Sequence, residues 1–139
     1  MKTFLLIAGV VLGLGRMAYT EEFAVIVNAT NAIEAGSIRD VFLGEKKFQG
    51  DIKLIPMHSS DEKVKGAFLA TFVKMSAKDY KAYMVKKVFQ DGIMAPVAKS
   101  SPKEIVDFVA EEEGAVGYVP KAYATGPRIK IVATFADQP

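Results

Sequence analysis

The hydrophobic pattern of the chain predicts four short strands. Residues 23–27 (FAVIV) form an almost continuous apolar run that ends at Asn28, which is typical of a strand buried on both faces. Residues 52–57 (IKLIPM) alternate in part and predict a second strand with a proline near its end. Residues 115–119 (AVGYV) and 129–132 (IKIV) predict two more short strands.

Capping residues mark the predicted helices. Ser37 precedes IRDVFL and Gly44 follows it, so we expect a short helix between them. The next segment, EKKFQGD, is polar and contains glycine, and it predicts an exposed turn. Ser59 and Glu62 have the spacing of a capping box, which predicts the start of a second helix.

A third helix is expected between Ser76, with Asp79 three residues later, and Gly92. Aromatic, methionine and aliphatic side chains recur at helical spacing in the second and third helices, a pattern that indicates core packing rather than a cofactor site. The side chains expected to face inward are Val64, Ala67, Phe68, Phe72, Val73, Tyr80, Tyr83, Met84 and Val88.

The clearest helix signal consists of Ser101, Pro102 and Glu104, which are an N-cap, a proline at the first helical position and a capping-box acid. This helix is expected to end at three glutamates, residues 111–113, and Gly114. Carboxylates near a helix C-terminus oppose the macrodipole, so we interpret them as a solvated face, with a cation site as the alternative. The alternation of strands and helices predicts an α/β fold with a central sheet.

Residues 1–20 have the pattern of a secretory signal peptide. A basic start is followed by an apolar run, residues 4–14, which is shorter than the roughly 20 residues that a spanning helix needs. The small residues Ala18 and Thr20 favour cleavage after Thr20, and a second cleavage site follows Gly15. The alternative interpretation of this segment is an N-terminal anchor or a buried first strand.

The net charge of the chain depends on whether the predicted leader is counted. The whole chain has 18 basic and 16 acidic residues, and its formal net charge of +2 hints at an anionic partner. Lys2 and Arg16 both lie in the predicted leader, so the mature chain would carry 16 charges of each sign. Such a neutral chain, with its lysines scattered, does not favour nucleic acid as a partner. Half of the residues are hydrophobic, which excludes a disordered chain.

The chain contains no cysteine and a single histidine, His58. This composition excludes disulfides, thiolate metal sites, a cysteine nucleophile and the lipid-anchored cysteine of a lipoprotein. The sequence has no Gly-x-Ser-x-Gly elbow, and no glycine-rich phosphate loop or dinucleotide fingerprint stands between a strand and a helix. We therefore expect no cofactor, while a metal site built from carboxylates alone stays open.

An ordered set of motifs resembles a known family. The segments FAVIVNATN, RDVFLG with EKKF, LIPMH, KAYMVKKVF and EEEGAVGYVP are similar to the phosphate-type periplasmic substrate-binding proteins of ABC transporters, and above all to their short single-lobe relatives. The similarity extends from about residue 23 to about residue 132. It implies one lobe of a type II periplasmic-binding-protein-like fold, a central mixed sheet flanked by helices, as a single domain at residues 21–139. It also implies export to the periplasm.

The resemblance implies a ligand site at one edge of the sheet. In such sheets ligands bind beyond the carboxyl ends of the strands, where helix N-termini point their amide groups. The segments that follow the first and second expected strands, together with the neighbourhood of Tyr118, would form this rim. The candidate ligand-binding residues are Asn28, Thr30, Asn31, His58, Ser59, Ser60, Lys63 and Tyr118.

The chemistry of this rim departs from the family. The receptors carry an arginine, an acidic residue and a Ser-Gly-Thr cradle after the second strand, whereas this chain has HSSDEKVK, without arginine or glycine. Asp61 and Glu62 would repel an anion, since two unit charges ~6 Å apart at an effective dielectric of ~20 cost ~3 kcal/mol, or about a hundredfold in affinity. Lys63 and Lys65 would offset this repulsion if they faced the rim.

A single lobe leaves the ligand open on one side, so a homodimer or a partner protein would have to supply the second wall. The leading interpretation is an exported, non-enzymatic protein that binds phosphate or another small oxyanion or polar solute. The alternative is a ligand-free accessory module that docks on a membrane transporter, a porin or a sensor. An enzyme is disfavoured, because the neighbouring His58 and Ser59 do not by themselves form a base and nucleophile pair.

Overall fold

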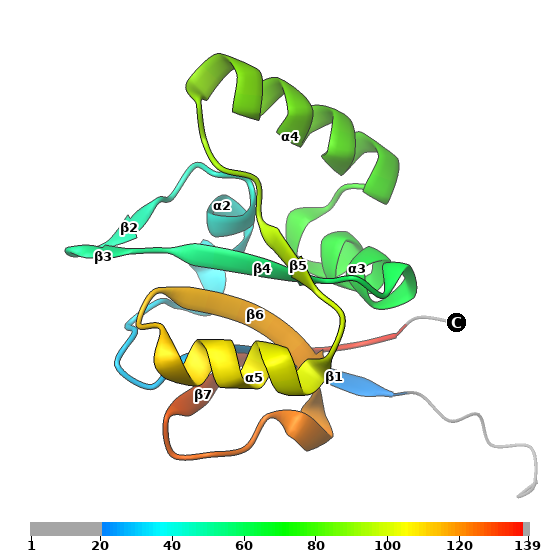
Figure 1. Ribbon diagram of the computed structural model, residues 1–139. Coiled ribbons are helices and arrows are strands. Elements are labelled where there is room, and N and C mark those ends of the chain that lie inside the picture. Colours follow the sequence, from blue (N-terminus) through cyan, green and yellow to red (C-terminus); the bar gives the residue numbers. More distant parts are fainter. Residues whose placement is uncertain (1–20, 138–139) are drawn as a thin grey trace, which may run out of the picture.

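Five strands form one mixed sheet in the order β5–β4–β6–β1–β7 (Figure 1). The computed structural model describes residues 21–137, so the predicted signal peptide lies outside the described residues. The expected α/β fold, a central mixed sheet flanked by helices, is confirmed. In chain order the elements are β1 (Glu22–Asn28), η1 (Ala35–Ser37), α2 (Ile38–Phe42), β2 (Phe48–Gln49), β3 (Ile52–Lys53), β4 (Ile55–Ser59), α3 (Glu62–Phe68), η2 (Leu69–Val73), α4 (Ala77–Asp91), β5 (Val97–Lys99), α5 (Pro102–Glu111), β6 (Ala115–Pro120), η3 (Lys121–Tyr123) and β7 (Ile129–Ala136).

The apolar run of β1 reflects its central position. β1 lies between β6 and β7 and is antiparallel to both. Alternate side chains of β1 pack on opposite faces of the sheet, and those from residue 23 to residue 27 are at most 2% exposed. The prediction of a strand buried on both faces is therefore confirmed.

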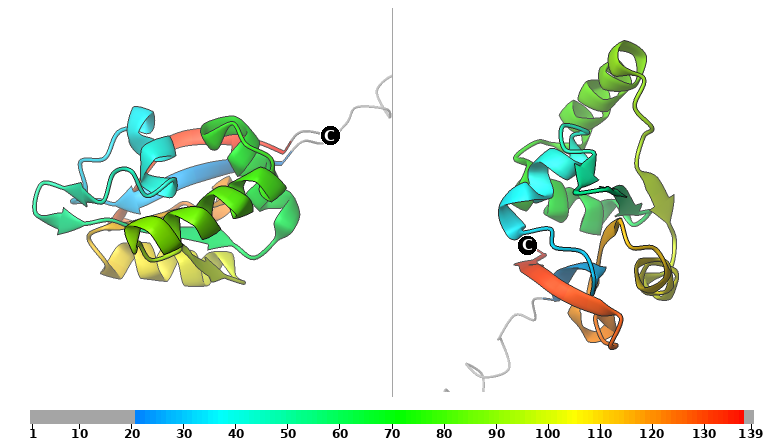
Figure 2. Two further views of the ribbon diagram at one scale, coloured as in Figure 1. Left: turned by 90° about the horizontal axis from the view of Figure 1, so that it is seen from above. Right: turned by 90° about the vertical axis from the view of Figure 1, so that its left-hand side faces the viewer.

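Helices cover both faces of this sheet (Figure 2). α2, α3, η2 and α4 contribute to the core on one face, where the rings of Phe68 and Tyr118 stack with centroids 4.1 Å apart. α5 covers the other face, and its Ile105 and Val109 pack against Ala24 and Ile26 of β1. α4 lies at the outside of its layer and projects from the body of the molecule.

The predicted serine caps are confirmed for α4 and α5. The hydroxyl groups of Ser76 and Ser101 cap α4 and α5. The N-cap of α3 is Asp61, so the predicted capping box of Ser59 and Glu62 is wrong. The carboxylate of Asp61 lies closer to the amide groups of the first turn, because β4 continues to residue 59 before the chain turns.

Two strands lie where the pattern predicts none. β2 falls in the expected exposed turn and pairs with β3 in a small hairpin, so the expected strand at residues 52–57 divides into β3 and β4. β5 pairs in parallel with β4 at the edge of the sheet. β2 has two residues and β5 three, too few for alternation to be visible in the sequence. Ser37 makes no side-chain cap, because the turn η1 leads directly into α2.

Candidate functional site

The parallel strands β4 and β5 bring two serine-containing segments together at their carboxyl ends. Ser59 lies opposite Lys99 in the sheet, and the N–H of Ser60 donates to the carbonyl oxygen of Lys99 at 3.0 Å. α3 and α5 begin directly after these two strands. The edge therefore places serine hydroxyl groups beside two helix N-termini, which is an arrangement that oxyanion sites use.

The amide groups of both helix N-termini are largely in use. The Asp61 carboxylate accepts from the N–H groups of Lys63 at 3.0 Å and Val64 at 3.4 Å. At α5 the Ser101 hydroxyl accepts from the N–H groups of the second and third helical residues, and Pro102 at the first position has no N–H. A negative charge thus occupies the N-terminus of α3, where an anion would bind.

Both lysines near this edge interact with other side chains. The ammonium of Lys63 lies 3.2 Å from the carboxylate of Asp137, and the Lys63 side chain is 74% exposed. The ammonium of Lys65 lies over the ring of Tyr80, 5.9 Å from its centroid. Neither contact brings a lysine onto Asp61, so the repulsion expected from the sequence persists in the structure.

His58 lies behind this edge in a buried hydrogen-bond network. Its Nδ1 is 2.8 Å from the hydroxyl of Tyr118, and its Nε2 is 2.9 Å from the hydroxyl of Tyr80. The Tyr80 hydroxyl donates to the carbonyl of Phe42 at 2.8 Å, so its oxygen accepts from Nε2–H. Tyr118 then donates to Nδ1 and accepts from the N–H of Ser59 at 3.2 Å. One tautomer, with the proton on Nε2, satisfies every group.

Burial keeps this network neutral. The pKa of His58 falls from 6.5 to about 3, chiefly because burial disfavours the charged ring and secondly because Lys65 is near. Burial also raises the pKa of Tyr80 and of Tyr118 well above the usual 10.0. Because both ring nitrogens are engaged, His58 orients Tyr118 and, through it, the backbone of Ser59, and a ligand role of His58 would act through these contacts.

Three of the eight candidate residues lie at the opposite end of the strands, where β4 and β6 begin. β1 is antiparallel to β6, so its carboxyl end lies beside the start of β6 and far from the end of β4. The side-chain amides of Asn28 and Asn31 donate to backbone carbonyls at the end of α5 and in the turn before β6, while the hydroxyl of Thr30 donates to Asn28. The expectation that one rim unites all candidates is wrong, since it assumed a parallel β1. His58, Ser59, Ser60, Lys63 and Tyr118 do lie together.

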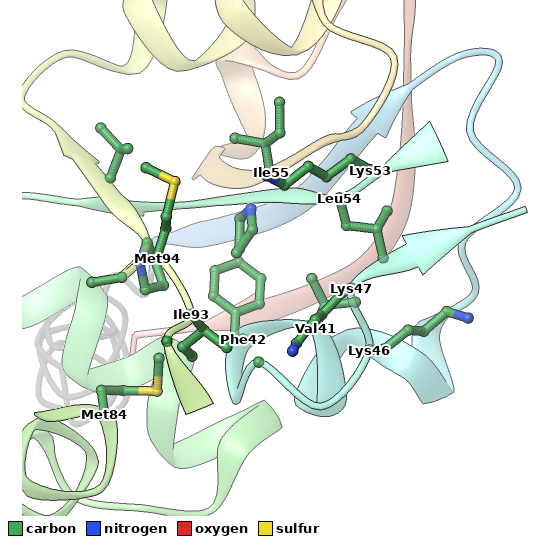
Figure 3. A pocket seen from close by; sticks show the side chains of 16 residues that line it. Val41, Phe42, Lys46, Lys47, Lys53, Leu54, Ile55, Met84, Ile93 and Met94 are labelled. Carbon is green, nitrogen blue, oxygen red and sulfur yellow. The ribbon is translucent and has the colours of Figure 1, made fainter. Parts of the chain in front are cut away.

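The pockets of the described chain flank α4. One has a volume of about 390 Å³ and lies between the end of α2, β3 with β4, and residues 92–97 (Figure 3). The other has a volume of about 740 Å³ and lies between α3 and α4, with His58 and Tyr80 in its wall. Met84, Ala95 and Pro96 line both pockets. The sequence gives no signal for them, because the lining residues come from segments far apart along the chain.

The described residues contain neither a candidate metal-ion cluster nor a helix suited to span a membrane. Residues 21–137 contain no cluster of three or more His, Asp or Glu side chains able to hold a metal ion, so the cation site considered for residues 111–113 is wrong. Over the same residues, no helix combines the length and apolar character that a membrane span requires.

Solved receptors share this fold. The chain superposes on an ABC-type phosphate transport receptor from Vibrio cholerae with a TM-score of 0.59 and 12% identity, over 81% of this chain and 46% of that one. The chain also superposes on a candidate phosphate ABC transporter substrate-binding protein from Clostridium perfringens, solved with bound phosphate. The TM-score is 0.60 and the identity 16%, over 81% of this chain and 44% of that one. A third match is a candidate phosphate-binding protein from Planctomyces limnophilus, with a TM-score of 0.54 and 14% identity over 81% of this chain and 41% of that one. The chain has the phosphate-receptor fold.

This phosphate-receptor fold confirms the architecture that the sequence motifs implied. The chain spans less than half the length of these receptors. A scan against protein-family models and a search of curated proteins give no match. The ligand role of His58, Ser59, Ser60, Lys63 and Tyr118 stays a prediction.

Proposed function

We propose that the protein is an exported, non-enzymatic solute-binding or accessory protein that binds phosphate or another small oxyanion. The observation that carries the proposal is the fold it shares with three phosphate-type receptors. The leader pattern of residues 1–20 supports a periplasmic location, and the absence of cysteine argues against a lipid anchor.

The anion would bind where β4 and β5 end. The Ser59 hydroxyl accepts from the N–H of Asp61 at 3.1 Å, so its own hydrogen remains for a ligand. Ser60 is exposed beside it. The carboxylate of Asp61 opposes the anion, and we expect it to weaken binding by about a hundredfold relative to an uncharged cap.

The site needs a second wall to enclose its ligand. Small-molecule sites cover most of the ligand surface, whereas Ser59 and Ser60 lie at the carboxyl end of β4, where Ser60 is exposed to solvent. The receptors with this fold are more than twice as long as the matched part of this chain. A second copy of the chain or an envelope protein would supply the missing wall.

Calorimetric titration with phosphate and sulfate tests this function, and Asp61→Asn makes the test sharper. Asparagine caps helices as well as aspartate does, so the variant loses the charge but keeps the cap. We expect Asp61→Asn to bind phosphate ten to about a hundred times more tightly than the wild type. Asp51→Asn, in the exposed β2–β3 turn, changes the net charge equally and should retain wild-type affinity. No heat from either the wild type or Asp61→Asn at millimolar phosphate would refute oxyanion binding.

A second candidate function is docking on an envelope protein, in which the lobe serves as an adaptor. The observation that favours it is the apolar surface around α4, where Phe89 is 84% exposed and Met94 is 81% exposed. Exposed apolar side chains that gather on one surface, unlike single ones, indicate an interaction site.

A further inference from the structure

The two pockets beside α4 share part of their lining. Met84, Ala95 and Pro96 line both the pocket of about 390 Å³ and the pocket of about 740 Å³. We call this surface the α4 groove: it comprises the residues of α4 that line the larger pocket, the connection at residues 92–97, and the parts of α2, α3, β3 and β4 that face them. Figure 3 shows the smaller pocket, with Phe42, Leu54 and Ile93 around it and Lys46 pointing away.

Exposed apolar side chains concentrate at the α4 groove. Seven large apolar side chains of the described residues are exposed, and Val85, Phe89, Met94 and Val97 all lie on α4 or on the segment that follows it. Their exposed fractions are 49%, 84%, 81% and 47%. Each of the four is also next to, or part of, the pocket lining. An apolar cluster beside concave pockets indicates an interaction surface.

Lysines dominate the charged side chains that line the groove. Six lysines line the two pockets, and Glu62 is the single acidic residue in their lining: the lysines are Lys46, Lys47, Lys53, Lys65, Lys78 and Lys81. This excess is local, since residues 21–139 carry as many acidic as basic side chains. A second copy docked through the same face would set these lysines against each other, which disfavours a symmetric dimer there.

One face of α4 combines lysines with exposed apolar side chains. Lys78, Lys81, Val85 and Phe89 follow one another at spacings of three or four residues, and all four line the larger pocket. A bound chain would meet lysines at the N-terminal end of this face and apolar side chains at its C-terminal end. The pockets are hollows in which side chains fit, whereas a bilayer surface would leave them unfilled.

We propose that the α4 groove binds an acidic, apolar segment of a partner protein. Apolar side chains of that segment enter the hollows beside Met84 and Pro96, and its carboxylates approach Lys65, Lys78 and Lys81. This proposal rests on the docking role suggested above and gives it a location and a partner chemistry. It does not require oxyanion binding, which concerns Ser59 and Ser60 at the carboxyl end of β4, although His58 lies in the wall of the larger pocket.

Site-specific photo-crosslinking in the producing cells tests the groove. Replacement of Phe89 or Met94 by a benzophenone-bearing amino acid should give one protein adduct, whose cross-linked peptide, read by mass spectrometry, is both acidic and apolar. The same probe at Ile131 or Tyr123, which are exposed by 43% and 50% and lie outside the pocket linings, should give none. Circular dichroism of each purified variant verifies the fold.

Charge variants test the role of the lysines that line the α4 groove. The triple variant Lys65→Gln, Lys78→Gln and Lys81→Gln should reduce the adduct yield at position 89 at least fivefold, because the partner loses its cationic contacts. A matched triple change at the exposed Lys103, Lys121 and Lys130 should leave the yield unchanged.

Other outcomes overturn the proposal in distinguishable ways. Adducts with lipid, or with a second copy of this chain, would identify a different occupant of the groove. Adducts from positions 123 or 131 alone would place the docking surface elsewhere and leave the docking role intact. No adduct from any position would refute docking itself, and an adduct insensitive to the lysine changes would refute the acidic partner.

Discussion

At the scale of residues, the protons around His58 are fixed by their neighbours. A second proton on the ring would turn Nδ1 into a donor toward Tyr118, whose hydroxyl hydrogen would then lose its acceptor. The Tyr118 oxygen already accepts from the N–H of Ser59. Protonation would therefore break the network as well as place a charge in a buried site, and this burial, with Lys65 nearby, lowers the pKa of His58.

The stability of the fold should decrease in acid because of this one ring. The pKa of His58 is about 3 in the folded state and 6.5 when the ring is free, so the unfolded chain binds the proton more readily between these values. The free energy of unfolding should fall by about 1.4 kcal/mol for each pH unit below 6.5 and level off near pH 3. Urea denaturation at a series of pH values measures this slope.

The single histidine makes the test specific. The imidazole resonances of the folded protein should stay those of a neutral ring at pH 5, in contrast to those of the unfolded chain in urea. The variant His58→Gln should lack the part of the slope that the ring supplies, while the carboxylates contribute as before. A folded protein whose imidazole titrates near pH 6.5 would contradict the buried network.

The sequence identified five residues that do cluster but missed what holds them. His58 can be recognised as a histidine at a strand end, yet its burial depends on Tyr80 and Tyr118, which lie 22 and 60 positions away. The charge conflict at Asp61 was predictable, because the repulsion follows from local sequence alone. The prediction that Asn28 and Asn31 lie at the same site as Ser59 was wrong, because the local sequence does not determine whether β1 is parallel or antiparallel to its neighbours.

At the scale of elements, Gly114 allows β4 and β6 to approach each other. Its carbonyl accepts from the N–H of Ile55 at 2.7 Å, and a Cβ at this position would collide with the backbone carbonyl of Lys53. The sequence predicted Gly114 as a helix stop, whereas the structure shows that Gly114, between α5 and β6, lies in close contact with the backbone of Lys53 in β3. The requirement for glycine is therefore steric.

Two glycine-to-alanine substitutions should have opposite effects. Gly114→Ala should destabilise the protein by about 3 kcal/mol, because the strand junction must move. Gly66→Ala, within α3 and with open space at its Cβ, should stabilise it by about 0.5–1 kcal/mol through helix propensity. Urea denaturation of both variants at neutral pH compares them directly. Equal stabilities would show that the backbone contact at Gly114 is loose.

Element boundaries were predictable where one local signal sufficed. The caps at Ser76 and Ser101 were correct, because each serine precedes a helix whose first amides need an acceptor. β5 was missed, since three residues at a sheet edge are held by pairing with β4 rather than by their own pattern. The antiparallel direction of β1 likewise depends on β6 and β7, which lie near the other end of the chain.

At the scale of the whole molecule, we predict that cleavage after Thr20 leaves β1 complete. β1 begins at Glu22, and the carbonyl of Glu21 accepts from the N–H of Asp137 at 3.2 Å, so a chain that begins at Glu21 retains the strand and this hydrogen bond. The intact mass of the exported protein should correspond to a chain that begins at Glu21. Its net charge at pH 7 would then be zero, because Lys2 and Arg16 are removed. A mature chain that retains Arg16 would contradict this cleavage and restore a positive charge to the protein, whereas a chain that begins at Glu21 leaves the lysines of the α4 groove as a local feature.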